Sequence, residues 1–257
     1  MMNFIEDVLK QGKNKLVVDA RSYAHKVLMQ HKPYPWHDAV LYSNYMKQVV
    51  SLLKADALVL RFDKMLEEEL TNNKDLVEKM GEKKRSGYAL KIFMQDEGLR
   101  EITSSLINTA TNTLHMHILT QLPNPLELLK MTAKAVGASE EFENETIENA
   151  AVYCADWLRS YKDSKVSGLL FDERNQSLPP ETYAPISNVA TNYGWSVGFR
   201  HEKKLQFGDF AVPVLDSEFW CNKEAIAPDF KQSFFTEIDQ DAIPEVVLEK
   251  LSTLLKG

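Results

Sequence analysis

The chain has 257 residues, of which 44% are hydrophobic and 26% are charged, and its formal net charge is −7. This length fits one β/α barrel and buries a sizeable core, while the acidic balance excludes a general binder of nucleic-acid phosphates. No apolar run approaches the roughly 18 residues that span a bilayer and no cleaved leader is recognised, so we expect a cytoplasmic protein without a membrane partner.

Short apolar stretches alternate with helical ones along the chain. Residues 3–30 predict a helix, the proline-containing segment 32–36 breaks it, and residues 38–54 predict a second helix. Beyond this point the stretches that predict strands are, in chain order, 57–63, 88–96, 114–121, 166–173, 195–202, 210–218 and 233–239. Apolar strands without clean alternation, separated by helices, are typical of a parallel sheet that is covered on both faces.

The sequence therefore predicts the α/β class and, within it, a TIM-type (β/α)8 barrel with an N-terminal helical extension. Seven strands are clear, and either residues 16–19 supply the eighth or the barrel is incomplete. We expect a single domain over residues 1–257, with a helical leader over 1–54 and the barrel over 55–257.

Charged residues follow most of these strands, and a parallel β/α barrel carries its chemistry at the carboxyl ends of its strands. The first confident strand ends in Arg61 and Asp63, which share a direction if both belong to the strand. An acid beside a cation can hold an anionic substrate and also handle a proton. The alternative is a salt bridge that seats the next helix.

Two later strand ends offer further acid–base candidates. Glu173 follows Asp172, and two neighbouring carboxylates can separate their pKa values as general acid–base catalysis requires; the alternative is a capping acid with a surface ion pair. His201 follows Arg200, and imidazole titrates near neutral pH and also binds metals. The catalytic candidates are Asp63, Glu173 and His201.

The candidates for substrate binding lie at the same predicted strand ends. Arg61 and Arg200 would hold acidic groups, while Gln95 and Gln121 end two other predicted strands and Trp220 offers an aromatic surface. No glycine-rich dinucleotide or phosphate-binding loop and no nucleophile elbow is present in the sequence.

Several segments together resemble a known superfamily. Residues 54–66 (KADALVLRFDKML) resemble a strand that leads to a catalytic aspartate, here Asp63. Residues 122–136 resemble a strand-to-helix junction, with Asn124 in place of the usual glycine. Residues 168–173 resemble a strand that ends in acids, and residues 238–251 resemble a closing strand and helix. In this order they resemble the uroporphyrinogen decarboxylase and cobalamin-independent methionine synthase superfamily.

The departures from the superfamily's pattern shape what the resemblance implies. The methyltransferase branch has a His-x-Cys zinc pair, but His201 is followed by glutamate and lysine; Glu218 would match that branch's glutamate ligand and Cys221 would have to substitute for a cysteine. The decarboxylase branch has an arginine-bearing amino-terminal loop, and here the leader offers only Arg21. Uroporphyrinogen itself is therefore not the expected substrate.

We expect a lyase that acts on a small or aromatic carboxylic acid without a redox cofactor, and thus a small-molecule carboxylate as ligand. One alternative is a zinc-dependent methyl or alkyl transferase with His201, Glu218 and Cys221 as metal ligands. Another is a non-catalytic barrel that binds a ligand or serves as the partner subunit of another enzyme. The sequence is also compatible with a homodimer.

Overall fold

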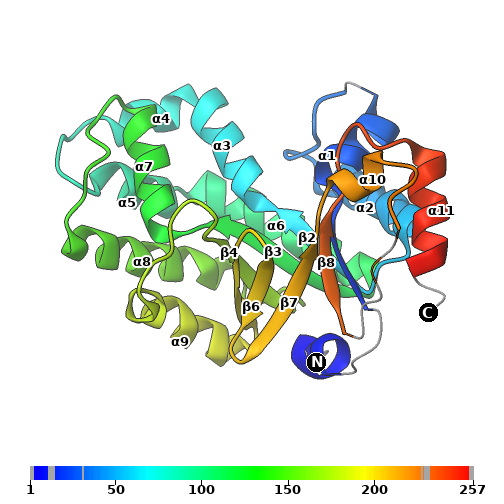
Figure 1. Ribbon diagram of the computed structural model, residues 1–257. Helices are drawn as coiled ribbons and strands as arrows, with labels where there is room; N and C mark the ends of the chain where they lie inside the picture. The colour runs from blue at the N-terminus through cyan, green and yellow to red at the C-terminus, as the bar shows by residue number, and fades with distance from the viewer. Residues whose placement is uncertain (1–2, 11–14, 31, 227, 229–231, 255–257) are drawn as a thin grey trace.

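Eight strands close into a barrel in the order in which they follow along the chain (Figure 1). The computed structural model describes residues 3–10, 15–30, 32–226, 228 and 232–254. The strands are β1 Leu16–Asp19, β2 Ala57–Arg61, β3 His117–Pro123, β4 Gly168–Asp172, β5 Ser196–Arg200, β6 Lys204–Phe207, β7 Phe210–Leu215 and β8 Phe234–Glu237. This architecture confirms the predicted α/β barrel.

One strand runs against the others. β6 pairs antiparallel with both β5 and β7, whereas the remaining neighbours are parallel. The turn between β6 and β7 contains Gly208 with a φ of 54°, a left-handed conformation that glycine adopts without steric cost. A hairpin therefore stands where a regular repeat would place a helix, and the sequence analysis did not identify β6.

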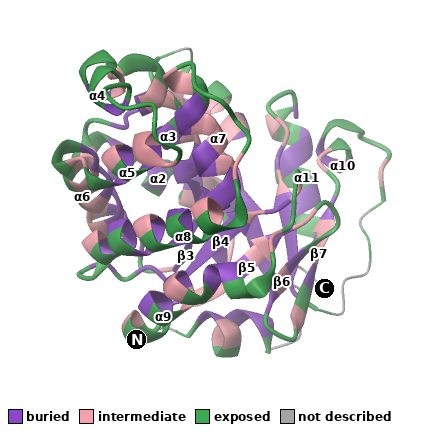
Figure 2. Ribbon diagram, turned by 90° about the vertical axis from the view of Figure 1, so that its left-hand side faces the viewer, coloured by how far each residue is buried: buried purple, intermediate pink, exposed green. Residues whose placement is uncertain are grey.

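Helices cover the outside of the barrel (Figure 1). They are α1 Arg21–Ala24, α2 Ala39–Leu53, α3 Phe62–Asn72, α4 Lys74–Met80, α5 Tyr88–Gln95, α6 Glu97–Leu114, α7 Pro125–Ala135, α8 Asn144–Leu158, α9 Ala184–Tyr193, α10 Glu218–Cys221 and α11 Pro244–Leu254. Figure 2 shows buried residues concentrated in the strands and on the helix faces turned toward them. None of the described helices is long and apolar enough to cross a membrane.

Two predicted elements need correction. The segment 88–96 is helix α5 and not a strand, because Leu90, Phe93 and Met94 recur at helical spacing and pack their side chains into the core. Residues 1–54 are not a purely helical leader, since the buried run Leu16–Asp19 is strand β1 and the barrel begins there. A four-residue apolar run carries too little periodicity to distinguish a strand from a helical turn.

The barrel interior is apolar on the amino-terminal side of the polar residues that end its strands. Inward-facing residues from the strands, among them Val17, Val59, Leu119 and Leu170, form one buried cluster with the amino-terminal turn that carries Phe4 and Val8. The positions two residues further along β1, β2, β3 and β4 face the same way because side chains alternate along a strand. These positions lie at the carboxyl ends of the strands, and their residues are polar.

Candidate functional site

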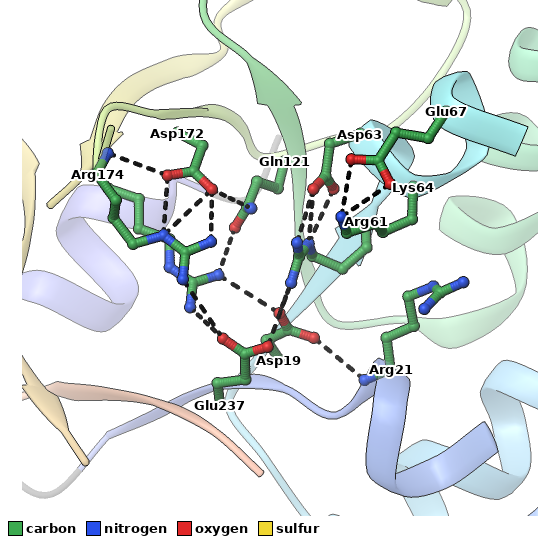
Figure 3. A network of polar contacts seen from close by, with 11 residues as sticks. Asp19, Arg21, Arg61, Asp63, Lys64, Glu67, Gln121, Asp172, Arg174 and Glu237 are labelled. Atoms are coloured by element: carbon green, nitrogen blue, oxygen red, sulfur yellow. Dashed lines mark hydrogen bonds and ion pairs between the residues drawn. The ribbon is translucent and has the colours of Figure 1, made fainter. Parts of the chain in front are cut away.

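Polar side chains from six strands converge at the carboxyl end of the barrel (Figure 3). The register of the strands brings them level, since Asp19 lies opposite Glu237, Arg61 opposite Gln121, and Asp172 opposite Arg200. We call this set the charged mouth, and it comprises Asp19, Arg61, Asp63, Gln121, Asp172, Arg174, Arg200 and Glu237.

Arg61 is the buried centre of one half of the charged mouth. Its Nε and Nη2 donate to the two oxygens of Asp63 at 2.8 and 2.7 Å, and its Nη1 donates to Asp19 Oδ2 at 2.7 Å. The same Nη1 lies 3.4 Å from Glu237 Oε1. Burial alone would lower the pKa of Arg61, but Asp19 and Asp63 outweigh it and raise that pKa, so the guanidinium stays charged.

Arg200 is the centre of the other half. Its Nη1 donates to Gln121 Oε1 at 2.8 Å, and its Nη2 donates to Glu237 Oε2 at 2.5 Å. Gln121 in turn donates through Nε2 to Asp172 Oδ2 at 3.2 Å. Because Gln121 is fully buried and uses both ends of its amide, it joins the arginine of β5 to the carboxylate of β4.

The side of the charged mouth that faces solvent carries Asp172, Arg174 and Glu237. Arg174 pairs with Asp172 at 2.6 Å and lies 3.8 Å from Glu237. The side chains of Arg174 and Glu237 are 29% and 32% exposed, whereas that of Arg200 is 4% exposed. A ligand that approaches from solvent therefore meets Arg174 and Glu237 first.

The arginines of the charged mouth lower the pKa values of two of its carboxylates, Asp19 and Asp172. Burial would raise the pKa of Asp19, but Arg61 and Arg200 outweigh it and hold this pKa below 3.8. The pKa of Asp172 is lowered likewise, since its bonds to Arg174 outweigh burial. Three arginines thus face four carboxylates in a largely buried layer.

Three of the residues that were candidates for substrate binding lie in the charged mouth, namely Arg61, Gln121 and Arg200. The predicted pairing of Arg61 with Asp63 is also present, although Asp63 belongs to the first turn of α3 and not to the strand. Both of its oxygens accept from Arg61.

The two other catalytic candidates lie outside this network. Glu173 is buried, and its Oε1 accepts from the Tyr183 hydroxyl at 2.7 Å and from Leu178 N at 3.1 Å, which ties down the loop that follows β4. His201 is half-buried where β5 turns into β6, and its backbone N donates to Lys204 O at 2.9 Å. Their catalytic roles stay predictions.

The remaining candidates are scattered over the molecule. Gln95 is exposed on α5, and Trp220 is fully buried and donates through Nε1 to Thr236 Oγ1 at 2.7 Å, as a core residue does. Glu218 and Cys221 are exposed on α10. Among the residues that the structure describes, no three His, Cys, Asp or Glu side chains gather into a group that could hold a metal ion.

Sequence reasoning did not select Asp19 or Glu237 as candidates for the substrate site. Asp19 ends a run too short to be assigned as a strand, so the rule that chemistry lies at strand ends was not applied to it. The usable signal was the apolar stretch LVV followed directly by Asp19 and, two residues later, by Arg21, because other predicted strands also end in charged residues.

Comparisons with known proteins add little to this geometry. No family model matches the chain, and no curated protein matches it. Among solved structures, the chain is similar to a truncated form of 3-deoxy-D-arabino-heptulosonate 7-phosphate synthase from Thermotoga maritima, at 14% sequence identity over 97% of this chain and 90% of that chain, with a TM-score of 0.17. A similarity at this level carries no argument about function.

Proposed function

We propose that the charged mouth binds a small carboxylic acid and that the protein acts on it as a decarboxylase-like lyase without a redox cofactor. The observation that carries this proposal is the buried layer of three arginines and four carboxylates at the end of the barrel where such folds hold their substrates. Buried ion pairs are costly to desolvate, and apolar replacements are often at least as stable. A layer needed only to fill the barrel would be apolar, as the layer below it is.

Arg174 and Arg200 are the proposed anchors for the substrate carboxylate. A guanidinium binds a carboxylate through two parallel hydrogen bonds, and Arg174 is the arginine of the charged mouth most open to solvent. Both arginines now pair with protein carboxylates, Arg174 with Asp172 and Arg200 with Glu237. An incoming carboxylate exchanges for these partners, so binding rearranges charges that are already in place.

Glu237 is the proposed proton donor. It lies within 4 Å of three guanidiniums, so a carboxylate ligand that takes over some of these contacts is bound directly beside it. When the substrate's C–C bond breaks, carbon dioxide leaves, the electron pair stays on the substrate carbon, and the Glu237 proton forms the new C–H bond. His201, next to Arg200 in sequence, is the alternative donor.

Asp63 enters this proposal as a positioning residue. It corresponds to the catalytic aspartate of the superfamily that the sequence resembles, but both of its oxygens are engaged by Arg61. Asp63 thereby orients Arg61, whose Nη1 is shared between Asp19 and Glu237.

The test is a panel of small aliphatic and aromatic acids with an isotope-labelled carboxyl group, incubated with the purified protein and followed by NMR for labelled bicarbonate. We expect turnover of at least one acid, its loss in Glu237→Gln with binding retained, and binding weakened about tenfold or more in Arg174→Gln, as for one lost charge-assisted contact. Glu148→Gln and Arg159→Gln, which alter exposed residues, are the matched controls. If no acid binds, or if Arg174→Gln binds as the wild type does, the proposal is wrong.

One observation favours a second candidate, a barrel that binds a carboxylate without converting it. Every arginine of the charged mouth is already paired within the protein, so the site needs no ligand to satisfy its charges. The same panel separates the two functions, because saturable binding that depends on Arg174 without release of labelled bicarbonate identifies the non-catalytic barrel.

A further inference from the structure

The loop that follows β4 carries Arg174, the arginine of the charged mouth that is most open to solvent. Residues 173–179, all of which the structure describes, form neither a helix nor a strand. Ordering a flexible loop costs conformational entropy, and a binding site that must order its loop loses affinity for that reason. The position of Arg174 therefore depends on contacts between this loop and the neighbouring elements.

One buried side-chain amide provides such contacts on both sides of the arginine. Asn124 is fully buried, and its Nδ2 donates to Gln176 O at 2.9 Å and to Asp172 O at 3.3 Å. These two carbonyl groups lie two residues after and two residues before Arg174. A single amide thus bridges the loop across the residue that is proposed to meet the substrate first.

The amide of Asn124 is itself held in place by α7. Its Oδ1 accepts from Glu127 N at 2.9 Å, which caps the amino-terminal end of this helix. The oxygen is engaged by the helix, so the donor nitrogen points to the loop. Because α7 begins directly after β3, Asn124 fixes the loop of β4 relative to the strand that also carries Gln121 of the charged mouth.

The hydrogen bonds of Asn124 matter most when a ligand binds. In the structure, Arg174 is also held by Asp172, whose carboxylate pairs with the guanidinium at 2.6 Å and accepts from Arg174 N at 3.2 Å (Figure 3). In the proposed exchange of partners, the substrate carboxylate takes the guanidinium from Asp172. The bonds from Asn124 go to main-chain carbonyl groups, which this exchange leaves untouched, so they hold the loop in both states.

We propose that Asn124 is a positioning residue for carboxylate binding, which keeps Arg174 in place for the incoming substrate. This inference rests on the proposed function of the charged mouth. Asn124 is buried and both ends of its amide are engaged within the protein, so it acts through Arg174 and not by contact with the substrate. A preorganised anchor raises affinity for the substrate and leaves the chemical step unchanged.

The experiment replaces the amide while it keeps the cap of α7. Serine is as good a capping residue as asparagine but lacks the donor nitrogen, so Asn124→Ser removes the bonds to the loop. We measure hydrogen exchange of the amides of residues 174–178 without ligand, and the affinity for an acid that the wild type binds. We expect exchange about tenfold faster and affinity about fivefold or more weaker, as for a lost hydrogen bond, with kcat of a converted acid within about twofold.

Two further variants separate the loop contact from the helix cap. Asn124→Asp keeps the size of the side chain and the cap but replaces the donor nitrogen by an oxygen, so it should behave as Asn124→Ser does. Asn73→Ser is the matched control, because Asn73 caps α4 in the same way, with Oδ1 accepting from Leu76 N at 3.2 Å, while its Nδ2 donates to Glu69. This control should change neither the exchange of residues 174–178 nor the affinity.

A double-mutant cycle with Arg174→Gln tests whether Asn124 acts through the arginine. Asn124→Ser should weaken binding in the wild type and add almost nothing in Arg174→Gln, whereas a general loss of stability would act alike in both backgrounds. Equal effects in the two backgrounds, or unchanged exchange and affinity in Asn124→Ser when the wild type binds through Arg174, would overturn this inference alone. A wild type that binds no acid would refute the proposed function, and the role of Asn124 with it.

Discussion

Replacement of Asp19 by asparagine tests how far the charged mouth depends on its most buried carboxylate. Asp19 is 1% exposed, and its Oδ2 lies 2.7 Å from Arg61 Nη1 and 3.5 Å from Arg200 Nη1. Asparagine keeps the size of the side chain but removes the charge that both guanidiniums face. Arg61 retains Asp63 and Arg200 retains Glu237, so neither arginine is left entirely without a carboxylate.

The expected loss follows from this partial compensation. Breaking a buried ion pair by removal of one partner costs about 3–5 kcal/mol, and the remaining carboxylates place Asp19→Asn at the lower end, at about 3 kcal/mol. For a chain of this length, such a loss lowers the midpoint of thermal unfolding by roughly 6–12 °C. The assay is urea unfolding at neutral pH, and Asp163→Asn, at an exposed position, is the control with an expected change within about 0.5 kcal/mol.

The dependence on pH provides a second readout of the same variant. Because the folded-state pKa of Asp19 lies below 3.8, its charge stabilises the wild type above pH 3.8, and this contribution is lost as the pH falls through the folded-state pKa. The difference in stability between the wild type and Asp19→Asn should therefore shrink below pH 3.8. A loss below about 1 kcal/mol at neutral pH, or a difference that stays constant in acid, would refute this account of the charged mouth.

Three further predictions concern the rest of the molecule. In Gly198→Ala the new Cβ would lie 2.3 Å from Phe207 Cε1 inside the barrel, so we expect a loss of about 1–3 kcal/mol in urea unfolding that Phe207→Leu partly restores; an unaffected stability would contradict the packing. Burial lowers the pKa of His117 below 6.5 in the folded state. The contribution of His117 to the free energy of unfolding should therefore be fully present above pH 6.5 and be lost as the pH falls through the folded-state pKa. Urea unfolding over this pH range should show this loss in the wild type and not in His117→Gln. A thiol reagent should modify the exposed Cys221 in the native protein and Cys154, whose pKa burial raises to about 12, only after unfolding; two reactive native thiols would argue against the fold.

The sequence alone determined the class of fold and much of the candidate site. Apolar runs that end in charged residues located most of the barrel strands, and the rule for strand ends identified Arg61, Gln121 and Arg200. The sequence also predicted the contact between Arg61 and Asp63. The two side chains meet because Asp63 lies in the first turn of α3, and not because both lie on one face of a strand. These successes rest on local properties, namely hydrophobicity and the spacing of neighbours along the chain.

The tertiary structure alone decided which strand ends meet. Residues 88–96 have an apolar run that suits a strand or a helix, and packing of one face into the core settled it as α5. Asp19 and Glu237, near opposite ends of the chain, lie side by side only because β1 pairs with β8 to close the barrel. Local spacing specifies which way a side chain points once its element is known, but its partners depend on register and closure, which arise from contacts between segments far apart in sequence.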